Sequence, residues 1–311
     1  KVLEIENDIL NDDLMDQARK DKLFIDEHKA AKLSRQDEIM MGRLVGRIPF
    51  VKNFNNAARV FLNKVRFDTW KAMRKSLSAT GEPTPEEGRQ IAMFVNEATG
   101  RGGLGKMEAA AVPLARAMFS PRYFASRMQM ATGHSMWGGT NRTRKLIAGE
   151  YARALVGMGL YYSLLALYFR DDKDKKKGSI DFDPRSSDFG KVRIGNTRVD
   201  PLAGISQVAT FLARTGVTTM NAAFRTNIPE TKRSTGQLAR LRGPHARYKW
   251  TDVAKRFAQS KLHPLPGIYA NMLDGVDLAG EEATLINQGA GLVSPITYGD
   301  ILKAFKEQDI D

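Results

Sequence analysis

The chain has 311 residues, of which 42% are hydrophobic and 27% are charged, a balance that excludes a wholly disordered protein. It contains no cysteine, which excludes disulfide bonds, thiolate metal sites and thiol nucleophiles. A formal net charge of +13 favours contact with nucleic acid, anionic lipid or an acidic protein surface, with simple solubility as the alternative explanation.

The N-terminal part, residues 1–50, is predicted to be a separate helical segment with a mixed-charge face. Its first 40 residues are charged throughout and lack the apolar stretch of a signal peptide. Because the chain begins at Lys1 rather than at a methionine, we expect it to be a fragment of a longer polypeptide.

The clearest amphipathic helix is predicted over residues 52–78, where apolar residues recur at the three-to-four spacing of one helical stripe. Between Lys52 and Lys75 there are seven basic residues and one acid, Asp68, so another side of this helix should be strongly positive. That side either packs within the fold or contacts a membrane surface or a DNA backbone. The candidate contacts for nucleic acid or an acidic partner are Arg59, Lys64, Arg66, Lys71, Arg74 and Lys75.

The stretch GRGGLGKM, residues 100–107, contains the G-x-x-x-x-G-K spacing of a phosphate-binding loop. Such a loop follows a strand and needs a serine or threonine after its lysine. Here a helix predicted to begin near Pro85 leads into the glycines, and Met107 occupies the hydroxyl position. We therefore predict a helix end and a glycine hinge at 100–105, followed by a new helix from about Lys106, and no nucleotide site.

The longest apolar run, ALVGMGLYYSLLALYF, covers residues 154–169 between Arg153 and Arg170. As a helix it would extend roughly 24 Å, which is shorter than the ~30 Å hydrocarbon core of a bilayer. Flanking arginines and interfacial tyrosines can make up part of the difference. Two interpretations stay open, a buried core helix and a membrane-inserting helix. The candidate membrane contacts are Leu155, Leu160, Tyr161, Tyr162, Leu164, Leu165, Tyr168 and Phe169.

The C-terminal part, residues 179–311, is predicted to combine a β-hairpin with further helices. β-branched residues flank Gly195 and Asn196, which indicates a hairpin at about 191–200. An apolar helix is expected over 201–224, and residues 231–250 form a basic, acid-free loop. Its candidate contacts for nucleic acid or an acidic partner are Lys232, Arg233, Arg240, Arg242, Arg247 and Lys249.

The sequence offers no positive support for an enzyme. The four histidines are too far apart along the chain to suggest a local metal-binding pair. Asp181 and Asp183 precede a proline, where an acid pair is more typical of a turn than of a cation site. We predict no catalytic residues, no metal and no cofactor.

Five segments in order resemble a family of phage proteins: ATGRGGLG at 98–105, FSPRYFASR at 119–127, DFGKVRIGNTRVDP at 188–201, PLPGIYANMLDGVDLAG at 264–280 and SPITYGDILKAFKEQ at 294–308. The chain is similar there to the C-terminal portions of large polyvalent proteins of bacteriophages, which include internal virion, or ejection, proteins of short-tailed phages. The resemblance spans roughly residues 50–308, and its motifs carry no known chemistry.

The resemblance implies a structural role. Such proteins are packaged in the virion interior, leave with the genome, and help to build a DNA-translocating conduit across the host cell envelope. The implied partners are other copies of the chain, other ejection or portal proteins, double-stranded DNA contacted through its backbone, and the host membrane. The alternative is a nonspecific nucleic-acid-binding or genome-packaging virion protein, for which binding should weaken steeply with salt.

The expected fold is mainly α, an elongated multi-helix architecture with one small β-hairpin. We expect three parts: residues 1–50, a helical domain over 51–178 that holds the glycine hinge and the apolar helix, and residues 179–311.

Overall fold

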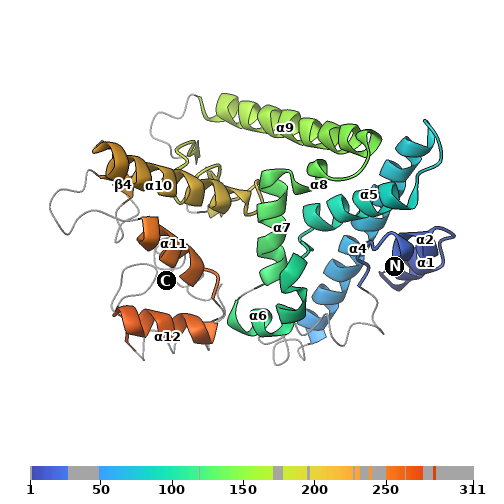
Figure 1. Cartoon of the computed structure of the whole chain (residues 1–311), viewed down its shortest axis with the longest axis horizontal. Coiled ribbons are helices and arrows are strands. Elements are labelled where there is room, and N and C mark those ends of the chain that lie inside the picture. The colour runs from blue at the N-terminus through green and yellow to red at the C-terminus, as the bar shows by residue number, and fades with distance from the viewer. Residues whose placement is uncertain are drawn as a thin grey trace, which may run out of the picture. The chain divides into compact units, whose positions relative to one another are not determined.

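The computed structural model is mainly α-helical, which confirms the predicted fold class (Figure 1). It describes residues 2–26, 49–118, 120–170, 178–194, 197–226, 228–231, 238–239, 250–262, 264–275 and 283–284. The chain divides into two compact units, Lys1–Tyr162 and Ser163–Asp311. This division differs from the predicted three parts, because the N-terminal residues belong to the same unit as the helices that follow them.

The first unit is built from helices. They are α1 (Val2–Leu10), α2 (Met15–Lys20), α4 (Pro49–Ser78), α5 (Pro85–Ala98), the 3₁₀-helix η2 (Gly105–Ala110), α6 (Ala111–Ala117), α7 (Pro121–Thr132), α8 (His134–Trp137) and the first part of α9 (Asn141–Phe169). The predicted amphipathic helix over 52–78 corresponds to α4. The short helix α8 lies between α7 and α9 in the chain.

The core of the first unit forms around Trp70 of α4, which is fully buried. It stacks on Phe67 with ring centroids 6.0 Å apart. The N-terminal residues join this core rather than forming a separate segment, since Met15 and Leu23 are also buried in it. On the apolar stripe predicted for α4, Trp70, Met73 and Leu77 are buried in this core, whereas Phe61, also apolar, is 66% exposed.

Helix α5 begins and ends as its sequence suggests. Thr84 and Glu87 form a capping box at its start, with Pro85 in the first turn. After the helix ends, Gly100 has φ +88° and Gly105 has φ +55°, backbone conformations that favour glycine. The GRGGLG segment is therefore a turn that follows a helix, and no strand precedes it.

Gly102 in this turn has no room for a side chain. Its N–H donates to the Arg122 carbonyl at 3.2 Å, and a Cβ added at Gly102 would lie 2.7 Å from Cα of Ser126. A Cβ added at the neighbouring Gly103 would meet nothing within 4 Å. The two glycines thus form a matched pair in one loop.

We expect Gly102→Ala to lower the free energy of unfolding by about 1–3 kcal/mol, the usual cost of inserting a carbon into a packed site. Gly103→Ala should be neutral or stabilising by up to about 1 kcal/mol, because it restricts the unfolded chain. Denaturant unfolding of both variants measures the difference. Equal stabilities would show that the turn does not pack tightly on α7.

The second unit contains the remainder of α9, short strands and three more described helices. The bounds are β1 (Ser179–Ile180), β2 (Val192–Ile194), β3 (Thr197–Val199), α10 (Ile205–Phe224), β4 (Glu230–Thr231), β5 (Leu238–Ala239), α11 (Trp250–Gln259) and α12 (Pro264–Asp274). β2 and β3 pair antiparallel, with Val192 opposite Val199, as the predicted hairpin requires. The hairpin is not the whole β structure, because β1 pairs with β2, and β4 pairs with β5.

Helix α10 starts later than the predicted residue 201 because Asp200 holds the preceding residues in a turn. Its carboxylate accepts hydrogen bonds from the N–H groups of Leu202 and Gly204 and from the Ser206 hydroxyl, at 3.0–3.1 Å. Further along α10, Phe211 stacks on Phe257 of α11 with centroids 4.3 Å apart. This contact joins α10 and α11 within the second unit.

Candidate functional site

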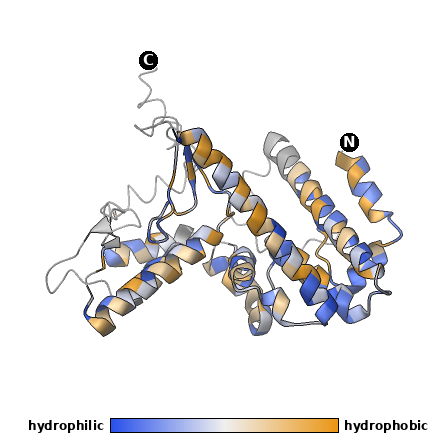
Figure 2. Cartoon of the chain, turned by 90° about the horizontal axis from the view of Figure 1, so that it is seen from above, coloured by the Kyte–Doolittle hydropathy of each residue, from blue (hydrophilic) through white to orange (hydrophobic). Residues whose placement is uncertain are grey.

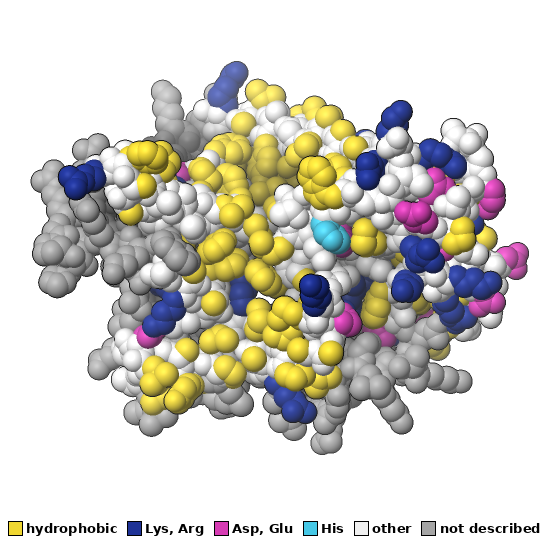
Figure 3. Space-filling view, viewed as in Figure 1, with side chains coloured by type: hydrophobic (Ala, Val, Ile, Leu, Met, Phe, Trp, Pro, Cys, Tyr) yellow, Lys and Arg dark blue, Asp and Glu magenta, His cyan; other side chains and the backbone are white. Residues whose placement is uncertain are grey.

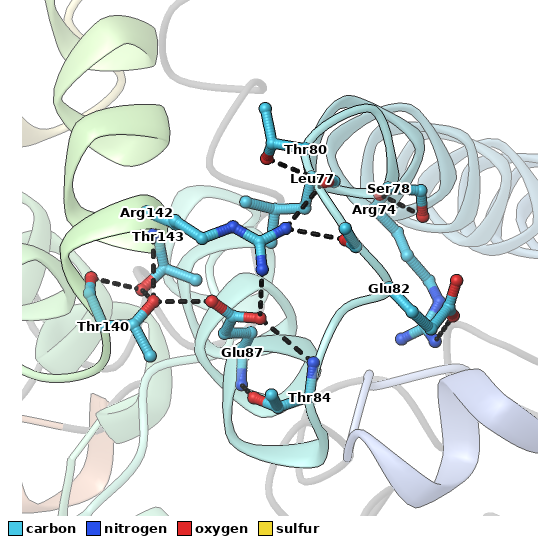
Figure 4. A network of polar contacts seen from close by, with 11 residues as sticks. Arg74, Leu77, Ser78, Thr80, Glu82, Thr84, Glu87, Thr140, Arg142 and Thr143 are labelled. Atoms are coloured by element: carbon cyan, nitrogen blue, oxygen red, sulfur yellow. Dashed lines mark hydrogen bonds and ion pairs between the residues drawn. The ribbon is translucent and has the colours of Figure 1, made fainter.

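The N-terminal half of α9 is fixed to α4 and α5 by a polar network centred on Arg142 (Figure 4). The Arg142 guanidinium donates to the carbonyls of Leu77 and Gly81, both at 2.7 Å. It also forms an ion pair with Glu87 at 3.4 Å. Because Leu77 lies in the last turn of α4 and Glu87 in the first turn of α5, with Gly81 in the segment between them, one side chain of α9 contacts two helices and their connection.

Glu87 receives further hydrogen bonds in this network. The Thr140 hydroxyl donates to it at 2.7 Å, and the backbone N–H of Thr84 donates at 3.0 Å. These donors, together with the charge of Arg142, stabilise the carboxylate and lower the pKa of Glu87 below its ordinary value. The Glu87 side chain is 2% exposed, so the network is shielded from solvent on this side.

The lowered pKa predicts a pH-dependent contribution of Glu87 to stability. A carboxyl whose pKa is lower in the folded state stabilises the fold fully above its unfolded pKa, about 4.3 for glutamate. That contribution should disappear as the pH falls through the folded pKa. The free energy of unfolding, measured between pH 7 and pH 3, should therefore fall less with decreasing pH for Glu87→Gln than for the original chain. An equal pH dependence in the two chains would contradict a stabilising role of the ionised Glu87 carboxylate.

The C-terminal half of α9 has a different character, because its apolar residues are exposed. Leu155 is 73% exposed, Leu160 61%, Leu164 67% and Tyr168 70%. Figure 2 shows the helix changing from hydrophilic to hydrophobic along its length. In the space-filling view, hydrophobic side chains gather over α9 (Figure 3).

The predicted membrane contacts lie on two sides of this helix. Leu155, Leu160, Tyr161, Leu164 and Tyr168 are exposed, whereas Tyr162, Leu165 and Phe169 are half-buried. Adjacent rings contact each other, Tyr161 with Tyr162 at 5.7 Å and Tyr168 with Phe169 at 5.3 Å between centroids. Helix α9 brings all eight residues together over its last four turns.

The core-helix interpretation of residues 154–169 is wrong, since none of the apolar window of α9 is buried within the protein. Within the described part of the chain, α9 is the one helix long and apolar enough to cross a membrane. This criterion concerns length and composition only. Insertion into a bilayer therefore stays a prediction. Because the apolar side chains are exposed, it can be tested by substitutions that do not disturb a core.

The basic residues predicted on α4 are largely paired within the first unit. Arg59 forms a bidentate pair with Glu6 at 2.6 and 3.0 Å. Lys71 pairs with Asp12 at 2.5 Å, and Lys64 pairs with Asp68 at 2.6 Å. Acids of the N-terminal segment, far away in sequence, thus neutralise much of the positive side of α4.

The remaining predicted cations of α4 differ from one another. Arg74 pairs with Asp21 at 3.3 Å and with Glu82 at 3.2 Å. Arg66 is 4% exposed, and it donates to the Thr99 hydroxyl at 2.8 Å. Lys75 is exposed. The structure therefore does not assemble these six residues into one free positive surface, and their contact with DNA stays a prediction. Of the candidates in 231–250, Lys232, Arg233, Arg240, Arg242, Arg247 and Lys249 lie outside the described residues.

Among the described residues, no group of three histidines or acids could hold a metal ion. His134 contacts Glu97 at 2.6 Å, and burial raises the pKa of the Glu97 carboxyl. Asp181 and Asp183 form a turn as predicted, with the Asp181 carboxylate accepting from the N–H of Asp183 at 2.9 Å.

No protein-family model, curated protein or solved structure matches this chain. The resemblance to phage ejection proteins therefore stays a prediction from the quoted segments.

Proposed function

We propose that the chain is a structural part of an internal virion protein of a short-tailed phage. In this proposal it leaves the particle with the genome and contributes to a DNA-translocating conduit across the host envelope. The proposal assigns it no catalytic role and no cofactor. It acts through assembly with other copies and other ejection or portal proteins, and through contact with a membrane.

The observation that carries the proposal is the contrast between the two halves of α9. The first half is held by Arg142, with donors 2.7 Å from two backbone carbonyls. The second half presents leucines and tyrosines that the protein leaves exposed. Covering the exposed part of one such leucine is worth roughly 1–2 kcal/mol. A helix attached to a folded base, with an apolar surface free to contact a bilayer, suits a component of such a conduit.

The flanking residues fit a membrane environment as well. Arg153 and Arg170 lie at the two ends of the apolar segment, where long cationic side chains can reach lipid head groups. Tyr161 and Tyr168, both exposed, have the amphipathic character favoured at membrane interfaces. These features support association with a bilayer surface or insertion into it.

The experiment that tests the proposal follows the chain from the particle to the cell. The chain should be present in purified phage particles and should appear in the envelope fraction of host cells soon after infection. The purified chain should float with lipid vesicles in a density gradient. Absence from particles, or a chain that stays at the bottom of the gradient, would overturn the proposed function.

A further inference from the structure

The exposed side of α9 follows a seven-residue repeat, with positions named a to g. Val156 and Ser163 occupy position d, and Leu160 and Leu167 occupy position a, at alternating spacings of four and three. Val156 is 63% exposed, Leu160 61% and Leu167 63%. The half-buried Met158 and Leu165 fall at position f, on the opposite side of the helix. Between Val156 and Leu167, the a and d positions therefore form an exposed seam of three apolar residues and Ser163.

We infer that this seam pairs with the same seam of a second copy of the chain, the two α9 helices lying parallel as a two-stranded coiled coil. An a/d seam of this spacing fits the facing helix by inserting side chains into holes between its residues. The inference deepens the proposed function, because it names the surface through which copies of the chain assemble.

Small residues beside the seam allow the two helices to approach closely. Ala152, Gly159 and Ala166 occupy position g, and Gly157 occupies position e. A Cβ added at Gly157 or at Gly159 would meet nothing within 4 Å, so neither glycine is required by packing inside the protein. Small residues next to a contact line let helix backbones approach, in a bilayer as well as in water.

The charges next to the seam are complementary in the parallel arrangement. Lys145 is exposed at position g, and Glu150 follows five residues later at position e. In a parallel pair, position g of one helix lies beside the next position e of its partner, so two-fold symmetry gives two Lys145–Glu150 pairs. An antiparallel arrangement centred on the apolar half would separate these residues. Charge complementarity therefore selects the parallel second copy.

One residue on the seam, Arg153, is charged, and its ion pair within the helix reduces the free-energy cost of bringing two such charges together. Arg153 occupies position a, where two like charges would face each other. Its guanidinium forms an ion pair with Glu150 of the same helix, and its side chain is 67% exposed. The Arg153 charge is therefore drawn to position e, where Glu150 also meets Lys145 of the second copy.

The first test uses disulfide formation between single introduced cysteines. Because the chain has no cysteine of its own, Ser163→Cys provides one thiol on the seam, and Leu155→Cys provides a matched exposed thiol at position c. Both variants are bound to phosphatidylcholine–phosphatidylglycerol vesicles at low protein density and oxidised. We expect the Ser163→Cys chain to form a covalent dimer severalfold faster than the Leu155→Cys chain. Equal rates would overturn the inference.

The second test separates pairing from membrane affinity. Leu160→Ala and Leu155→Ala remove the same apolar side chain from the same half of α9, so vesicle binding should fall equally in both. Self-association, measured by energy transfer between labelled copies, should fall only for Leu160→Ala. Lys145→Glu should weaken pairing by a few-fold, because it places two acids, the introduced glutamate of one copy and Glu150 of the other, beside each other. Equal self-association of the two alanine variants would overturn the inference.

The two proposals fail in different ways. Vesicle flotation with equal disulfide rates at positions 155 and 163 would remove the pairing and leave the proposed membrane association intact. Selective disulfide formation at 163 in solution, without flotation, would support the pairing and remove the membrane association.

Discussion

Replacing Leu160 and Leu164 together with aspartate is expected to abolish vesicle binding while leaving the fold intact. A charged side chain at the centre of a bilayer costs about 2.5–3.5 kcal/mol. Two of them would cost about 5–7 kcal/mol, and each 1.4 kcal/mol changes a binding constant by about tenfold. Binding should therefore fall by more than about a thousandfold if residues 154–169 insert, which vesicle flotation measures directly.

The fold should tolerate both changes because these leucines are exposed in the protein, Leu160 by 61% and Leu164 by 67%. The helical circular dichroism and the melting curve should match those of the original chain. A matched control is Leu212→Asp with Leu273→Asp, which places the same charges at leucines on α10 and α12 that are 59% and 71% exposed. The control should still float. Unfolding of the α9 variant, or flotation of it, would contradict the prediction.

The helices themselves could be predicted from local sequence features. The apolar spacing of 52–78 corresponds to α4, and the capping residues Thr84 and Glu87 mark the start of α5. The absence of a strand before the GRGGLG turn was also predictable, since a helix pattern runs directly into Gly100. These features depend on residues within a few turns of one another, where periodicity and capping carry the information.

The surroundings of the helices could not be predicted in the same way. Whether residues 154–169 form a core or a surface depends on what packs on them, and an apolar run fits both environments. Similarly, α4 contains a strong excess of basic residues, but the acids that pair with Arg59 and Lys71 lie 53 and 59 residues away in sequence. Composition within one helix shows its charge, and only the tertiary structure shows whether that charge is already paired.

The internal pairing of the α4 cations makes the predicted contact of this helix with DNA less favourable. A helix face whose cations already bind carboxylates neutralises fewer phosphates, so it displaces fewer counterions from the DNA. Arg59 is the strongest case, with its side chain 10% and that of Glu6 13% exposed. Membrane association through α9 requires no such exchange of partners, and this is why the apolar surface supports the proposed function better than the basic one.

The attachment of α9 to the first unit gives the prediction with the largest effect on stability. Arg142→Met removes the guanidinium but keeps a long apolar stem, so packing is largely retained while the Glu87 carboxylate loses its cation. The carbonyls of Leu77 and Gly81 lose their donor as well. A buried charge that loses its partner costs about 3–5 kcal/mol. Because the Arg142 side chain is 35% exposed, we expect the low end of that range, about 3 kcal/mol, in denaturant unfolding.

Arg153→Met is the matched control, since Arg153 belongs to the same helix and its ion pair with Glu150 is on the surface. Such pairs contribute at most about 1 kcal/mol. Combining Arg142→Met with Glu87→Gln should recover part of the loss, because the neutral amide no longer requires a cation. If Arg142→Met is no more destabilising than Arg153→Met, the network in Figure 4 does not hold α9 in place. A stability loss specific to Arg142, with vesicle binding retained, would show that the two halves of α9 have separate roles, one in attachment and one in contact with the envelope.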